Sequence, residues 1–113
     1  MRLTYQEQQV FRMLANAREP SDLSGAAGPL LFDDDQRKLA LRLGEIGDNS
    51  GGKIMLRAKE QRDLTSAEIE AALALLASDA AREWLRRWCH GDPTAKFMLD
   101  TLMMQLRAER ERS

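Results

Sequence analysis

The sequence predicts a small all-α protein, a helical bundle of four to five helices that forms one domain over residues 1–113. Three observations support this fold class. Apolar residues recur three and four positions apart in most segments, as they do on one face of a helix. Thr4 and Thr65 each precede a glutamate by three residues, which is the pattern of a capping box. Strong helix formers are common and β-branched residues are scarce.

The first helix is expected to begin after Thr4, whose hydroxyl and the Glu7 carboxylate can satisfy free backbone N–H groups. Val10 and Leu14 lie four residues apart on the predicted buried face. Glu19 precedes Pro20, and the residue before a proline disfavours the helical conformation, so the helix is expected to stop there. The Gly, Ser and Pro content of residues 20–32 predicts a flexible loop.

The segment after this loop has two interpretations. The acidic residues 33–35 suit a helix N-terminus, and Leu39, Leu43 and Ile46 follow at helical spacing. Alternatively, the alternation of Leu39, Leu41 and Leu43 would fit a short β-hairpin over residues 38–57, closed by a Gly-rich turn at 47–52. We favour the helix because its residues are strong helix formers, and the hairpin remains the alternative.

The second capping box, Thr65 with Glu68, begins a helical pattern that continues to His90. Ser78 could cap the chain again, so this stretch is expected to be either one kinked helix or two helices. Gly91 suits the end of a helix because glycine tolerates a positive φ. The last helix is expected to start at Pro93 and to end in a charged, fraying tail over residues 107–113.

The composition indicates in which cellular compartment the protein is expected. No apolar run approaches the ~20 residues of a membrane-spanning helix, and the N-terminal residues do not form an apolar signal core. The single cysteine, Cys89, cannot form an intramolecular disulfide and suits a reducing environment. We therefore expect a cytoplasmic protein without a membrane partner.

No catalytic or metal-binding constellation is predicted. Cys89 and His90 are adjacent, so on a helix their side chains diverge by about 100°. The chain has no second cysteine or histidine to complete a zinc site. The glycine-rich residues 44–53 lack the Ser or Thr that follows Gly-Lys in a phosphate-binding loop, because Ile54 stands there. The expectation is a protein that is not an enzyme and has no cofactor.

One basic block could contact an anionic partner. The chain has a net charge of −1, whereas residues 36–62 contain seven Lys and Arg against three Asp and Glu, a local charge of +4. Within this block, residues 36–54 partly resemble a helix-turn-helix, which makes a small DNA-binding transcriptional regulator that uses residues 36–62 the alternative function. Glycines 51 and 52 would weaken its recognition helix. The candidate anion contacts are Arg37, Lys38, Arg42, Lys53 and Arg57.

The C-terminal third carries the candidate surface for a protein partner. Apolar residues surround the last predicted helix on nearly every side, so one face would stay in water unless a second chain covered it. Trp and Arg are typical interface anchors, and Met is common at adaptable binding surfaces. A symmetric homodimer is the simplest arrangement that covers such a helix. The candidate partner-binding residues are Trp84, Arg87, Trp88, Phe97, Met103 and Met104.

The run GEIGDNSGG, residues 44–52, resembles stretches in small proteins encoded by phages of proteobacteria. The resemblance covers nine of the 113 residues and assigns no functional residue. It implies an accessory protein of a mobile element, a group whose members often inhibit a host machine by occupying its surface, as anti-CRISPR proteins do. Together these observations predict a non-enzymatic protein-binding protein, an inhibitor that binds a host protein or protein complex.

Overall fold

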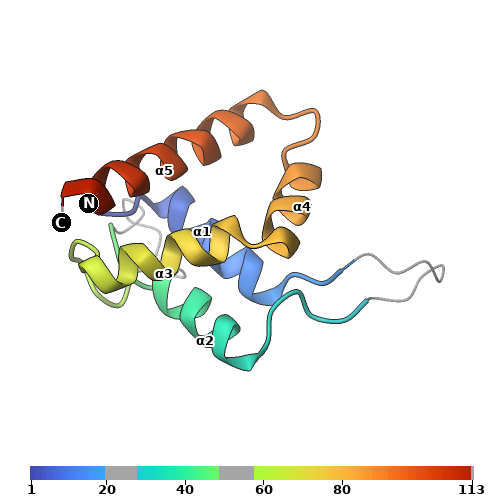
Figure 1. The fold of residues 1–113 in the computed structure, drawn as a ribbon, viewed down its shortest axis with the longest axis horizontal. Coiled ribbons are helices and arrows are strands. Elements are labelled where there is room, and N and C mark those ends of the chain that lie inside the picture. The colour runs from blue at the N-terminus through green and yellow to red at the C-terminus, as the bar shows by residue number, and fades with distance from the viewer. Residues whose placement is uncertain (20–27, 49–57, 113) are drawn as a thin grey trace.

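The computed structural model describes residues 1–19, 28–48 and 58–112. Within these residues the chain forms helices and no sheet, which confirms the all-α prediction (Figure 1). The helices are α1 (Tyr5–Asn16), α2 (Asp34–Leu43), α3 (Ser66–Ala77), α4 (Asp79–Trp88) and α5 (Pro93–Arg112).

Both predicted capping boxes are present. The Thr4 hydroxyl accepts a hydrogen bond from the Glu7 amide at 3.2 Å, and the Glu7 carboxylate accepts one from the Thr4 amide at 2.9 Å. Thr65 and Glu68 repeat this exchange at the start of α3, at 3.2 and 2.8 Å. Each box satisfies two N–H groups that a helix N-terminus otherwise leaves unpaired. The first helix nevertheless ends at Asn16, earlier than the expected stop at Glu19.

The chain around Arg18 explains the early end of α1. Arg18 and Leu30 form an isolated antiparallel bridge, in which the Glu19 amide donates to the Pro29 carbonyl at 2.9 Å. The Leu31 amide donates to the Ala17 carbonyl at 2.9 Å. Backbone groups after Asn16 therefore pair with residues 28–31 and not with a further helical turn. The last residues of the predicted loop at 20–32 are therefore hydrogen-bonded to the segment that follows α1. Residues 20–27 of this loop lie outside the described part of the chain.

The helical interpretation of residues 34–43 is confirmed, because α2 covers them. Its N-cap is Asp33, whose carboxylate accepts a hydrogen bond from the Gln36 amide at 2.8 Å. The hairpin alternative over 38–57 is wrong for its first strand, since residues 38–43 are helical. Residues 49–57, which would supply the rest of the hairpin and most of the Gly-rich turn at 47–52, lie outside the described residues.

The long pattern from Thr65 to His90 is two helices. Ser78 ends α3 and caps α4, with its hydroxyl accepting from the Ala81 amide at 3.3 Å. Gly91 takes a φ of 77°, as expected at the end of a helix, and Pro93 opens α5. Helix α5 continues to Arg112, so residues 107–112 are helical where the sequence pattern indicated a fraying tail.

The core lies between α1, α2, α3 and α5, with α4 crossing at one end of the bundle (Figure 1). Leu3 is fully buried, and the Met1 carbonyl accepts a hydrogen bond from the Leu64 amide at 2.9 Å. The N-terminus and the end of α5 lie on the same side of the molecule (Figure 1). None of the described helices is long and apolar enough to span a membrane. The largest fully buried apolar side chains are Phe11, Leu3, Leu14, Leu43, Ile46, Leu76, Leu102, Leu106 and Val10.

Candidate protein-binding groove

A groove of about 600 Å³ lies at the corner where the end of α3, helix α4 and helix α5 meet. In Figure 1, α4 joins α3 to α5, and α5 then runs back over the bundle. This size is within the range of pockets that bind ligands in proteins. Apolar side chains from all three helices make up much of its lining; they are Leu76, Ala77, Leu85, Leu99 and Met103.

Four cationic side chains also line this groove, two from α4 and two from α5, against one carboxylate. Arg86 and Lys96 are engaged within their own helices: Arg86 donates to Glu83 at 2.8 and 3.0 Å, and Lys96 donates to Asp100 at 2.8 Å. These contacts raise the pKa of both cations. The other two are exposed and have no ion pair or hydrogen bond through their side chains within the described part of the chain. They are Arg82 and Arg107.

Cys89, His90 and Gly91, at the turn between α4 and α5, also line the groove. Partial burial raises the pKa of the Cys89 thiol, and the carboxylates of Asp100 and Asp92 raise it further. A thiol with a raised pKa is a weak nucleophile near neutral pH. Among the described residues, no group of three or more His, Cys, Asp or Glu side chains could hold a metal ion. The surroundings of Cys89 therefore favour packing over covalent chemistry.

The structure does not bring the six predicted partner-binding residues into one site. Met103 is half-buried and lines the groove. Phe97 and Met104 are 74% and 65% exposed and lie seven residues apart, on the outer face of α5. Because seven residues are about two helical turns, these two side chains share that face.

The two tryptophans lie on a different side of α4 from the groove. Their rings stack with centroids 6.4 Å apart and planes inclined by 14°. Trp84 and Arg87 line a separate, smaller cavity of about 240 Å³ with Leu31, from the segment that follows the end of α1. Both rings are half-buried against the core, so Trp84 and Trp88 contribute to the packing of α4 on the bundle.

Three of the predicted anion contacts, Arg37, Lys38 and Arg42, lie on α2, and two of them contact groups within the protein. The Arg37 guanidinium donates to the Ala15 carbonyl at 2.9 Å, which joins α2 to α1. Arg42 lies 3.7 Å from a Glu60 oxygen and 3.8 Å from a Glu68 oxygen. Lys38 is exposed, while Lys53 and Arg57 lie outside the described residues. The expected recognition helix opens at residues 49–52, which lie outside the described residues.

Sequence reasoning missed the groove, although a signal for it was present. Arg82 and Arg86 lie four residues apart and therefore share a face of α4. Leu85 and Cys89, also four apart, lie on the neighbouring side of that helix, and all four residues line the groove. The sequence pattern does not give the angle between α4 and α5, which meet at the turn around Gly91. That angle determines which residues of α5 face α4.

Comparison of the chain with protein-family models, with curated proteins and with solved structures gives no match, so no family is assigned to it.

Proposed function

We propose that this protein acts without catalysis, by binding another protein through the groove between α3, α4 and α5. The observation that carries the proposal is a groove that combines recessed apolar side chains with two arginines that have no side-chain partner among the described residues. Concave sites with an apolar lining and a few polar groups are the usual form of a binding site. Arg and Met, both present here, are enriched at the centres of protein interfaces.

The proposed mode of action is inhibition by occupying the surface of a host macromolecular machine in the cytoplasm. The likeness of residues 44–52 to small phage proteins, including the anti-CRISPR type, supports this part of the proposal. The raised pKa of the Cys89 thiol supports action by contact and not by chemistry. A DNA-binding regulator ranks lower, because Arg37 and Arg42 are engaged within the protein.

The test is capture from a bacterial host lysate followed by reconstitution with the purified captured protein. The groove variant is Met103→Lys, which places a charge among the apolar lining residues. The matched control is Arg112→Glu, an exposed charge near the end of α5 that lies outside the groove lining. We expect the captured protein to bind wild type and the control and to lose roughly tenfold or more in affinity for the groove variant. Equal binding by all three folded proteins would refute the groove as the binding surface.

A further inference from the structure

We infer that the groove binds an acidic amphipathic α-helix of the partner, with its apolar face in the groove and carboxylates on the arginines of α4 and α5. The inference rests on the proposed function and specifies the chemistry of the partner. Three features of the groove support this inference: the backbone hydrogen bonding of its walls, the charge of its lining residues and the burial of its apolar side chains.

The walls of the groove have no free backbone edge for an extended peptide to pair with. All three walls are helices, whose N–H and C=O groups bond within the helix. The corner between α4 and α5 is also satisfied, since the Cys89 amide donates to the Leu85 carbonyl at 2.9 Å and the Asp92 amide donates to the Cys89 carbonyl at 2.9 Å. Strand addition is therefore unavailable. An amphipathic helix needs only side-chain contacts from such a groove.

The charge of the groove selects an acidic helix. Arg82, Arg86, Lys96 and Arg107 contribute four positive charges and Asp100 one negative charge, a balance of +3 for the lining. Arg82 on α4 and Arg107 on α5 line the groove together with the apolar residues, so each of these two helices contributes a positive charge that is not paired within the described residues. A helix with an apolar stripe between two rows of Glu would match this arrangement, and Arg can bind each carboxylate with two hydrogen bonds.

The alternative occupant of a basic, apolar surface is an anionic membrane, and the geometry disfavours it. Membrane-binding helices present projecting apolar side chains to the lipid. Here Leu99 and Met103 are half-buried, and Leu76 and Leu85 are buried. The projecting apolar residues, Phe97 and Met104, lie outside the groove lining. A partner that inserts side chains between α4 and α5 fits better than a flat lipid surface.

The experiment uses the full chain and synthetic peptides. One peptide of about 18 residues, roughly 27 Å long as a helix, carries a Leu stripe flanked by Glu. Its twin has Lys in place of every Glu. Binding is measured by calorimetry, and the contact site by chemical-shift changes in isotope-labelled protein. We expect the Glu peptide to bind about tenfold more tightly than the Lys peptide and to shift the resonances of Leu99 and Met103.

Charge reversal tests the arginines. Arg82→Glu combined with Arg107→Glu should lower the affinity for the Glu peptide about tenfold and reverse the preference between the two peptides. Arg112→Glu, the control charge reversal on α5 at a residue outside the groove lining, should leave both affinities unchanged. Binding of both peptides with equal affinity, or shifts confined to Phe97 and Met104, would overturn the inference. So would binding to phosphatidylglycerol vesicles that depends on these arginines when neither peptide binds.

These outcomes separate the inference from the proposed function. Suppose that the captured protein loses affinity for Met103→Lys but binds the arginine double variant as tightly as wild type. The groove is then a protein-binding site, and the inference that it binds an acidic helix is wrong. If the Glu peptide binds in the groove while the captured protein has the same affinity for Met103→Lys as for wild type, the groove does bind an acidic helix. In that case the proposal that the captured protein binds through the groove is wrong.

Discussion

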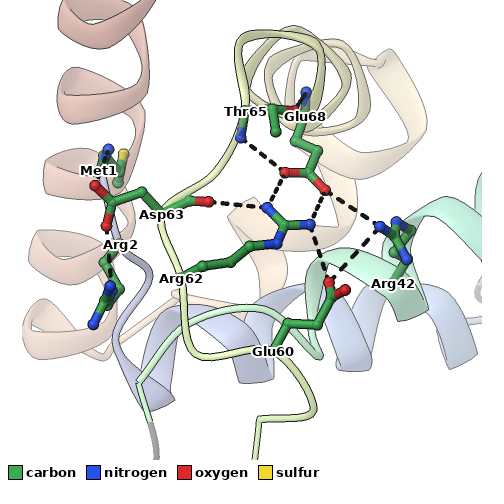
Figure 2. Close-up of polar contacts among 8 residues, drawn as sticks. All are labelled: Met1, Arg2, Arg42, Glu60, Arg62, Asp63, Thr65 and Glu68. Carbon is green, nitrogen blue, oxygen red and sulfur yellow. Dashed lines mark hydrogen bonds and ion pairs between the residues drawn. The ribbon is translucent and has the colours of Figure 1, made fainter.

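The carboxylate of Glu68 accepts two hydrogen bonds from the guanidinium of Arg62, at 2.7 and 2.9 Å (Figure 2). The same carboxylate accepts from the Thr65 amide and so completes the cap of α3. Arg42 of α2 approaches it at 3.8 Å, and Glu60 approaches both arginines. One side chain therefore joins the start of α3, the segment before it and α2.

Glu68→Gln is expected to destabilise the protein by about 1–2 kcal/mol near neutral pH, because it removes the negative charge from a bidentate contact. The hydrogen bond from Arg62 lowers the pKa of Glu68 from 4.5 to about 2. A lowered pKa in the folded state contributes stability above the ordinary pKa, and this contribution is lost as the pH falls from about 4.5 to about 2. Urea unfolding of wild type and variant should therefore differ most near neutral pH and converge in acid.

Glu83→Gln is the matched control for this prediction. Hydrogen bonding from Arg86 also lowers the pKa of Glu83 to about 2. The Glu83 side chain is 49% exposed, whereas that of Glu68 is 13% exposed. Solvent screens the exposed pair, so the loss of stability should be clearly smaller than for Glu68→Gln. Equal losses in the two variants would contradict the assignment of Glu68 as the joining residue.

Gly47→Ala is expected to cost about 3 kcal/mol, through strain and steric overlap together. Gly47 has a φ of 140°, and a Cβ there would meet the Leu3 carbonyl and lie 2.8 Å from Gln8 Nε2. The buried Gln8 amide group donates to the Asp48 carbonyl at 2.6 Å, so it has little room to move. Gly91→Ala is the control, since Gly91 has a φ of 77° and its Cβ would meet nothing within 4 Å.

The Gly91 variant should therefore cost only the backbone strain, about 1 kcal/mol. Thermal unfolding by circular dichroism measures both variants. If Gly47→Ala loses no more stability than Gly91→Ala, the close approach of Leu3 and Gln8 does not exclude a Cβ at position 47.

The outer face of α5 is predicted to mediate a homodimer. Phe97 and Met104 are both exposed on that face, and an antiparallel two-fold arrangement would place Phe97 of one copy against Met104 of the other. Phe97→Glu with Met104→Lys should then shift the mass in light scattering from dimer to monomer with unchanged circular dichroism. Met103 is left intact because it lines the groove and does not share the outer face of Phe97 and Met104. Wild type that is monomeric at tens of micromolar would refute the prediction.

Tight sequence-specific binding to DNA is not expected at physiological salt. The chain has a net charge of −1, and the charge of Arg42 is partly balanced by Glu60 and Glu68. Selection from a random pool of duplex oligonucleotides tests this directly. Enrichment of one motif that binds with nanomolar affinity would instead favour the regulator hypothesis for residues 36–62.

Cys89→Ala with His90→Ala is expected to leave partner inhibition intact, because the groove is proposed to act by contact. Both residues line the groove, but neither is among the apolar side chains and arginines proposed to hold the partner, so binding by the captured protein should change by less than about tenfold. Thermal unfolding serves as the folding control. Loss of inhibition with retained binding and folding would reveal a catalytic role that the sequence pattern does not indicate.

The sequence determined the local structure of this protein. Thr4, Thr65, Ser78 and Gly91 act at helix ends as their residue types predict, because a cap depends on atoms only three or four residues apart. Leu102 and Leu106 lie four residues apart on α5 and are both fully buried, as helical spacing requires of residues on one face. The all-α class follows from the same local rules.

Tertiary structure decided which surfaces face each other. The network of Arg42, Glu60, Arg62 and Glu68 joins residues from separate segments, and no spacing rule along one helix pairs them. The pairing of residues 28–31 with the end of α1 shortened that helix in the same way. The groove depends on the angles between α3, α4 and α5, which long-range packing sets. Local hydrogen bonds determine where each helix begins and ends. The angles at which the helices cross are determined by the burial of apolar side chains in the core that they share.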